Sequence, residues 1–390
     1  MGERRHDLLR LVSSVEDRID RVKQRLGERF DRDDPIQILP YRGFGTRERL
    51  LLQGRVLQDE PVGASDKGDT LWENLGNTWK RFESDEVPHV PVRARFGGWS
   101  EEVLTDEEGY FRFDIRLPQP LTPPADNRLW HDVELETRDP RTSQPVRATG
   151  SVLVPPAGAS FGVISDVDDT VVETGVTNRL AMARTVFLRN AHTRLPFKGV
   201  AAFYKALHQG QDGDDHNPVF FVSGSPWNLY DLLSEFMDLH GIPRGPLLLR
   251  DFGLDAGKLL KEETREYKLE CIRPILDLYP GLRFILIGDS GEQDPEIYRQ
   301  VVREYPGRVL AIYIRNIDAG PAREAAVLDI AREVREEEVP MLLVKDTEAA
   351  SVHALENGWI RPEKLPEVQR EKVKDEVAPS PAEVAISTEA

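Results

Sequence analysis

The C-terminal half of the chain alternates short aliphatic runs with segments of helical length, and this pattern restricts the fold more than any other feature. The runs include FGVIS (161–165), PVFFV (218–222) and RFILIG (283–288), with longer segments such as LYDLLSEFMDLHG between them. Strands that are apolar on both faces are typical of a parallel sheet covered by helices. The pattern therefore predicts an α/β fold with a doubly wound parallel sheet over residues 158–350.

Polar residues follow these aliphatic runs, at the edge of the sheet where such folds bind their ligands. The residues concerned are Asp166, Asp168, Asp169 and Thr170 after the first run, Ser223 and Gly224 after the second, and Asp289 and Asp294 after the third. Lys268 is predicted to open the helix that precedes the third run. Because each strand delivers a polar group to the same edge, the pattern indicates a functional site rather than packing.

The residue types at this edge suit the transfer of a phosphoryl group with a hard divalent cation. Mg²⁺ prefers oxygen ligands, and it would relieve the repulsion between carboxylates such as Asp166 and Asp289. An aspartate can attack phosphorus to form an aspartyl-phosphate. A second carboxyl two residues later, here Asp168, can protonate the leaving oxygen and then activate water. A lysine and a serine hydroxyl can hold the phosphoryl group.

The chain resembles the haloacid dehalogenase (HAD) phosphohydrolase superfamily, because DVDDT, Ser223, Lys268 and GDSGEQD match its four motifs in order. Within it, SDVDDTV, VSGSPWNLY and ILIGDSGEQDPEIY resemble the actin-patch-associated phosphatidate phosphatase family. LPYRGFGTRERLLLQGRVL is similar to the region upstream of the catalytic domain in bacterial members of that family. The resemblance covers residues 36–318.

This resemblance implies a role for each residue that matches a motif. Asp166 is implied to be the nucleophile and Asp168 the general acid and base. The implied magnesium ligands are Asp166, Asp168, Asp289 and Asp294, and the implied phosphate-binding residues are Thr170, Ser223, Gly224 and Lys268. Lys258 and Lys261 are open alternatives to Lys268. Asp169 is interpreted as a turn residue or a helix cap.

The implied reaction is hydrolysis of phosphatidate to diacylglycerol and phosphate. The segments between the motifs are too short for a large cap domain, which favours an open site and a phosphate carried by a lipid or a protein. One alternative is therefore a HAD phosphatase for a soluble or protein phosphomonoester, and another is a non-enzymatic adaptor. The basic residues between positions 179 and 194 would either meet an anionic lipid surface or solvate a helix face, and the second interpretation is favoured.

The N-terminal half has a different character. Residues 36–157 contain short alternating strands separated by Gly, Pro and Asp turns, which predicts a β-sandwich-like domain interrupted by an insertion over 57–86. In GYFRFDI we expect Tyr110 on one face of a strand and Phe111 and Phe113 on the other.

Residues 1–35 are predicted to form an amphipathic helix, since apolar residues recur at spacings of 4 and 3 from Leu8 to Leu26. Docking on its own domain is favoured for this helix. A homodimer through its heptad stripe and a peripheral contact with a membrane are the alternatives. Residues 351–390 are predicted to form a C-terminal helix followed by a tail that is disordered after about Pro362.

Composition excludes several classes of protein. The net charge of −17, from 51 basic and 68 acidic residues, argues against a general nucleic-acid binder, which needs a basic surface. Cys271 is the only cysteine, so the chain cannot form an internal disulfide. The N-terminus lacks an apolar signal segment, and no run of 18 apolar residues occurs. We therefore expect a cytoplasmic protein.

Overall fold

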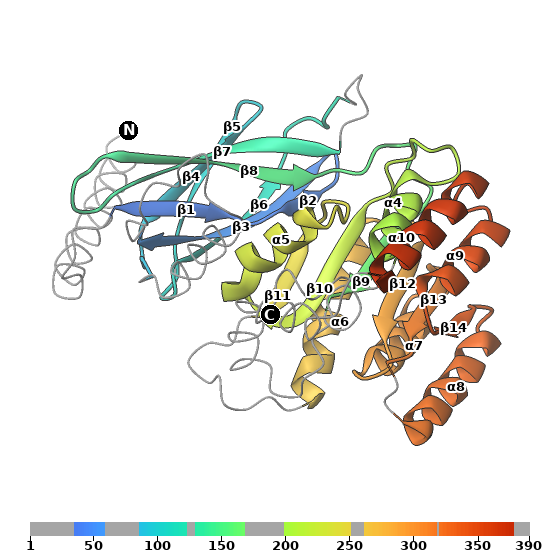
Figure 1. The fold of residues 1–390 in the computed structure, drawn as a ribbon. Coiled ribbons are helices and arrows are strands. Elements are labelled where there is room, and N and C mark those ends of the chain that lie inside the picture. Colours follow the sequence, from blue (N-terminus) through green and yellow to red (C-terminus); the bar gives the residue numbers. More distant parts are fainter. Residues whose placement is uncertain are drawn as a thin grey trace, which may run out of the picture. The chain divides into compact units, whose positions relative to one another are not determined.

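The computed structural model describes residues 35–58, 86–122, 129–167, 199–250, 261–317 and 320–377. The described residues divide into two compact units (Figure 1). The first takes its residues from 1–43, 49–118 and 132–152, and the second from 44–48, 119–131 and 153–390. The predicted N-terminal helix, most of the predicted insertion and the end of the predicted tail lie outside the described residues. The predicted disorder after Pro362 is wrong for Leu365–Val377, which form a helix.

The strands of the first half join in one sheet, in the order β1-β3-β2-β8-β7-β4-β5, and β6 pairs with β3. Their bounds are β1 (Ile36–Pro40), β2 (Gly43–Gly45), β3 (Arg49–Gln58), β4 (Pro91–Phe96), β5 (Trp99–Leu104), β6 (Tyr110–Arg116), β7 (Trp130–Arg138) and β8 (Pro145–Leu153). β3 is antiparallel to β1 and β6, and β4 is antiparallel to β5 and β7. A sandwich arrangement of these strands stays a prediction.

Strand β6 shows how the alternating pattern produces this unit. Phe111, Phe113 and Ile115 are buried, whereas the residues between them are exposed. This confirms the faces predicted for Phe111 and Phe113. In the register with β3, Gly54 lies opposite Phe111, and a Cβ at Gly54 would come within 2.5 Å of that ring. The same Cβ would lie 2.5 Å from the backbone carbonyl oxygen of Leu39 in β1, so the close approach of both neighbouring strands requires a glycine at this position.

The second unit contains a six-stranded sheet in the order β11-β10-β9-β12-β13-β14, and every neighbouring pair is parallel. The strands are β9 (Gly162–Asp166), β10 (Val219–Pro226), β11 (Leu247–Arg250), β12 (Phe284–Asp289), β13 (Val309–Arg315) and β14 (Met341–Val344). All residues of β9 and β12 are buried. The parallel α/β character predicted from the apolar runs is confirmed, whereas the HAD-like identity of the fold stays a prediction.

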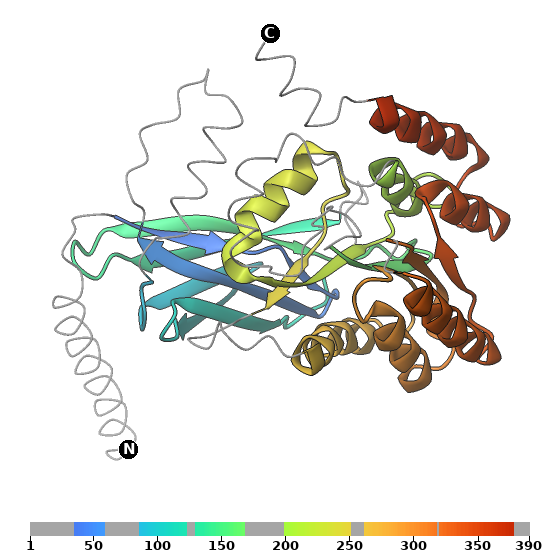
Figure 2. The same ribbon diagram turned by 60° about the horizontal axis from the view of Figure 1, so that its bottom comes forward.

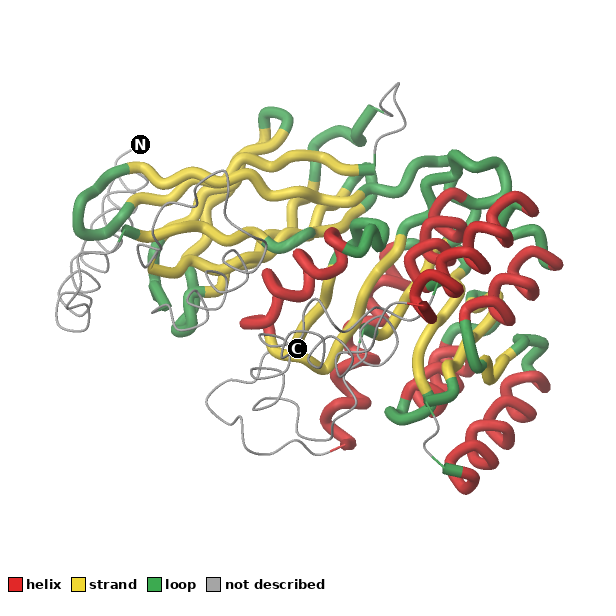
Figure 3. Tube along the Cα trace, viewed as in Figure 1, coloured by secondary structure: helices red, strands yellow, loops and turns green. Residues whose placement is uncertain are grey.

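The helices of the described residues, red in Figure 3, belong to this second unit. They are α4 (Val200–Gln209), α5 (Tyr230–Leu239), α6 (Lys261–Leu278), α7 (Asp294–Glu304), α8 (Pro321–Glu336), α9 (Thr347–Glu356) and α10 (Leu365–Val377), with short 3₁₀ turns at Trp227–Leu229 and Pro362–Lys364. In Figure 2, α4, α9 and α10 lie on one side of the sheet, and α6, α7 and α8 lie on the other. Among the described helices, none combines the length and apolar character needed to cross a bilayer.

The strand order places β9 in the middle of the sheet. The chain passes from β9 to β10 and β11 on one side, and then returns to β12 on the other side. The register pairs Ile164 of β9 with both Phe220 of β10 and Leu286 of β12. The carboxyl ends of β9, β10 and β12 therefore meet at the reversal of strand order, which is the position where open α/β sheets bind ligands.

Candidate active site

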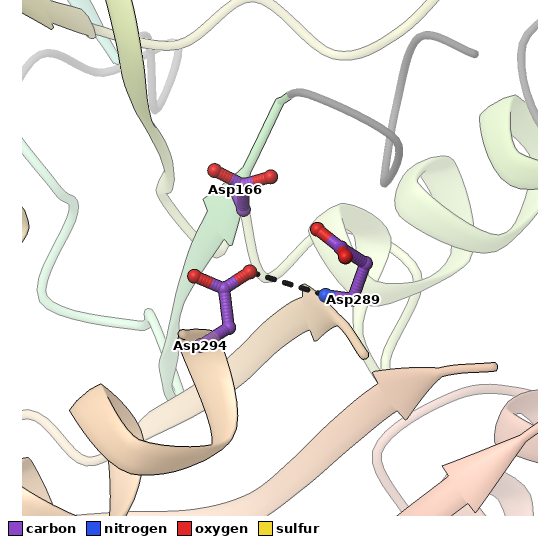
Figure 4. A group of neighbouring side chains, drawn as sticks. All are labelled: Asp166, Asp289 and Asp294. Carbon is purple, nitrogen blue, oxygen red and sulfur yellow. Dashed lines mark hydrogen bonds between the residues drawn. The ribbon is translucent and has the colours of Figure 1, made fainter. Parts of the chain in front are cut away.

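Three aspartates meet at the carboxyl ends of the two central strands (Figure 4). Asp166 is the last residue of β9, Asp289 is the last residue of β12, and Asp294 is the first residue of α7. Each offers a carboxylate oxygen within 4.8 Å of those of the other two. All three are at most 1% exposed. Carboxylates that are distant in sequence thus share one buried space.

The turn between β12 and α7 fixes two of these carboxylates by hydrogen bonds. Asp289 Oδ1 accepts from the backbone N–H of Gly291 at 2.6 Å and from that of Glu292 at 3.0 Å. Asp294 Oδ2 accepts from the backbone N–H of Asp289 at 3.1 Å. A Cβ at Gly288 would lie 2.4 Å from Asp294 Oδ2, so only a glycine leaves room for this carboxylate.

Lys268 lies between the carboxylates and is fully buried. Its Nζ is 2.6 Å from Asp166 Oδ1, 2.6 Å from Asp294 Oδ1 and 3.1 Å from Glu292 Oε2. The three N–H donors of the ammonium therefore have three carboxylate acceptors. The sequence reasoning did not single out Glu292, although it lies inside the GDSGEQD segment.

The predicted position of Lys268 at the start of a helix is wrong. Helix α6 begins at Lys261, so Lys268 lies inside it, about two turns from its start. Its place in the body of the helix allows the Lys268 side chain to be buried. The alternative Lys258 and the side chain of Lys261 lie outside the described residues.

Burial and neighbouring charges shift the pKa values of Lys268, Asp289 and Asp294. Burial by itself lowers the pKa of Lys268, but Asp166, Asp294 and Glu292 outweigh it and raise that pKa well above its usual value. Burial, together with the charges of Asp294 and Glu292, raises the pKa of Asp289 to about 8. Burial also raises the pKa of Asp294, against the opposing effect of Lys268. One ammonium does not balance three buried carboxyl groups and the partly buried Glu292, so the site has an excess of acid.

The donor atoms of this site fit a hard divalent cation. Asp289 Oδ2 is buried and has no hydrogen-bond partner among the residues that the structure describes. The three clustered carboxylates offer only oxygen atoms, which Mg²⁺ prefers to nitrogen or sulfur. A divalent charge would also offset the excess of acid. The residues thus suit the predicted Mg²⁺, which itself stays a prediction.

The remaining predicted residues divide into two groups. Ser223 and Gly224 lie within the last residues of β10, which continues to Pro226 rather than ending before them as predicted. Ser223 is buried, its Oγ accepts from the Ser225 N–H at 2.9 Å, and the preceding residue of β10 pairs with Asp166 in the register. Asp168 and Thr170 lie outside the described residues, so their predicted roles stay predictions.

The fold and the site together define a class of protein: a parallel α/β domain with an acidic, lysine-centred site at the carboxyl ends of its central strands. Residues 161–316, which contain this site, match the family model described as the catalytic domain of phosphatidate phosphatase APP1. The chain therefore carries a catalytic domain of the APP1-like phosphatidate phosphatase family.

Two curated relatives extend this match beyond the catalytic domain. The chain is 30% identical over 279 residues to the phosphatidate phosphatase APP1 of Saccharomyces cerevisiae, covering 68% of this chain and 45% of that protein. It is 29% identical over 240 residues to an uncharacterized protein of Schizosaccharomyces pombe, covering 61% of this chain and 37% of that protein. The chain thus spans less than half the length of either relative.

The chain also shows weak similarity to solved structures. A carbohydrate acetylesterase from Xanthomonas citri is 11% identical, with a TM-score of 0.30 over 77% of this chain and 66% of that one. A likeness at this score does not bear on the fold or the function of this chain.

Proposed function

We propose that this chain is a Mg²⁺-dependent phosphatase with a HAD-like catalytic domain that hydrolyses phosphatidate to diacylglycerol and phosphate. The observation that carries the proposal is the contact of Asp166 with Lys268 at the end of β9, beside Asp289 and Asp294, within the segment that matches the family model. The chain covers only part of each relative, so phosphatidate as the substrate is itself proposed here.

In the proposed first step, a carboxylate oxygen of Asp166 attacks the phosphorus atom and the bond to the glycerol oxygen breaks. Asp168 gives its proton to that oxygen, which leaves as the hydroxyl of diacylglycerol. In the second step, Asp168 takes a proton from water, and the resulting hydroxide attacks the aspartyl-phosphate, releasing phosphate and restoring Asp166. This sequence returns both carboxyl groups to their starting protonation states.

The other residues of the site bind and orient. Lys268 balances the charge of Asp166 and holds it by a 2.6 Å contact. Ser223, at the adjacent end of β10, offers its hydroxyl to a phosphate oxygen. Asp166, Asp289 and Asp294, together with the backbone carbonyl of Asp168, would hold Mg²⁺. When bound, Mg²⁺ supplies positive charge to the phosphoryl oxygens.

The test is release of phosphate from phosphatidate in mixed micelles, compared with release from soluble phosphomonoesters and phosphopeptides. We expect phosphatidate to be hydrolysed fastest, chelation of divalent cations to stop the reaction, and Asp166→Asn to reduce the rate about a thousandfold or more. Activity that survives Asp166→Asn would remove Asp166 as the nucleophile. Faster hydrolysis of a soluble or protein phosphomonoester would favour the alternative phosphatase.

A further inference from the structure

The turn that carries the site carboxylates is also bound from its outer side, by Arg323 of α8. Arg323 Nε donates to the backbone carbonyl of Ser290 at 2.7 Å, and Nη2 donates to that of Glu292. The same guanidinium is paired with Glu296 of α7 through Nη1 and Nη2. One side chain thus connects α8, the turn and the first turn of α7.

The two sides of this turn face different partners. The carbonyl of Ser290 and the N–H of Gly291 belong to one peptide unit, which is planar and trans, so they point in opposite directions. The carbonyl meets Arg323, and the N–H meets Asp289 Oδ1 at 2.6 Å. Arg323 therefore acts on the same rigid unit that orients the carboxylate of Asp289, without touching that carboxylate.

The charge of Arg323 suits this position. Hydrogen bonding to Glu296 raises the pKa of Arg323 against the effect of burial, and the charges of Asp289 and Asp294 raise it further. A planar guanidinium can donate to two carbonyls and one carboxylate at once, whereas a lysine ammonium cannot reproduce this fork. The turn is thus bound by a group whose shape and charge both match it.

We propose that Arg323 is a positioning residue, which holds the 290–292 turn in the conformation that directs its N–H groups to Asp289. The simpler alternative is that Arg323 only joins α7 to α8. Arg299 offers a matched control, because it also joins these helices, through Glu333 at 2.9 Å, and is similarly exposed at 27% against 23% for Arg323. Within the described part of the chain, Arg299 makes no hydrogen bond or ion pair with the turn.

The test measures hydrogen exchange of the Gly291 and Glu292 amides in the full chain, relative to the Ile312 amide in β13, which donates to Pro340 at 2.9 Å. We expect Arg323→Gln and Arg323→Lys to raise this relative rate about 10- to 100-fold, because two charge-assisted hydrogen bonds to the turn are lost or misaligned. Arg299→Gln should leave it unchanged. A relative rate equal to that of the wild type in either Arg323 variant, or an equal rise in Arg299→Gln, overturns the proposal.

A second measurement rests on the proposed function. It distinguishes a failure of the proposed function from a failure of the proposal about Arg323. If the wild-type chain releases phosphate with Mg²⁺, Arg323→Gln should raise the Mg²⁺ concentration for half-maximal rate about 10-fold or more, since groups that orient ligands tune metal affinity. A wild-type chain without activity would contradict the proposed function, while the exchange rates would still decide whether Arg323 positions the turn.

Discussion

At the scale of single residues, the site depends on one ammonium among several acids. Lys268 contacts Asp166, Glu292 and Asp294, and all four side chains are at most 11% exposed. An ion cluster of this kind contributes little net stability when complete, but removal of one member leaves uncompensated buried charge. The lysine is thus a structural requirement of the carboxylate cluster as well as a candidate ligand for phosphate.

We therefore expect Lys268→Met, which keeps the length of the side chain but removes its charge, to reduce the free energy of unfolding by about 3–5 kcal/mol without added metal. Urea unfolding at neutral pH would measure this loss. Addition of Asp294→Asn should restore part of it, because one of the acids then no longer repels the others. Equal stability of Lys268→Met and the wild type would show that the carboxyl groups do not depend on the ammonium.

At the scale of elements, the site depends on how closely α7 approaches the end of β12. Gly288 allows this approach, because the Asp294 carboxylate occupies the space where a Cβ would be. Such positions cannot be recognised from a strand pattern, in which Gly288 is one residue at the end of RFILIG. Only the distance between two elements gives this glycine its importance.

We expect Gly288→Ala to displace Asp294, to reduce phosphate release at least about 10-fold and to destabilise the chain by about 1–3 kcal/mol. Gly281→Ala is the matched control. Gly281 lies three residues before the same strand, and a Cβ at this position would have no heavy atom within 4 Å among the described residues. Phosphate-release assays and urea unfolding of both variants would check this. A loss of equal size in Gly281→Ala would contradict the steric explanation.

The elements also show what the sequence could and could not predict. Apolar runs and the residues after them located β9, β12, Asp166 and Asp289, because burial on both faces and clustered acids leave clear local signals. Contacts between elements leave no such local signal in the sequence. The sequence therefore does not indicate the contact of Glu292 with Lys268. It also predicts Lys268 at a helix start, because α6 begins upstream of any apolar pattern. The connection of α8 to the turn through Arg323 likewise joins residues more than 30 positions apart.

At the scale of the whole molecule, we expect the free energy of unfolding to fall in mild acid. Protonation of His208 should account for part of this fall. Its Nδ1 is 2.8 Å from the backbone carbonyl of Asn217, and its ring lies 5.8 Å from that of His216. Burial lowers the pKa of His208, the hydrogen bond opposes this effect, and His216 adds to it. The folded state therefore binds this proton less readily than the unfolded state, in which the pKa is about 6.5.

It follows that the contribution of His208 to stability is complete above about pH 6.5 and is lost as the pH falls toward its lowered pKa in the folded state. We expect the melting temperature of the wild type to fall more between pH 7.5 and pH 5.5 than that of His208→Asn, whose amide can still donate to the Asn217 carbonyl. Calorimetric melting of both proteins at the two pH values is the measurement. An identical fall in both would assign the acid sensitivity to other groups.

The central position of β9 has a consequence for synthesis of the chain. One edge of β9 pairs with β10, but the other waits for β12, and Asp166 meets Lys268 only 102 residues later in the chain. β12 begins 118 residues after the end of β9, so at translation rates of about 5–20 residues per second this aliphatic strand edge would stay unpaired for roughly 6–24 s on the ribosome. This edge can pair with other nascent strands during that interval, so the step most exposed to aggregation is the wait for β12.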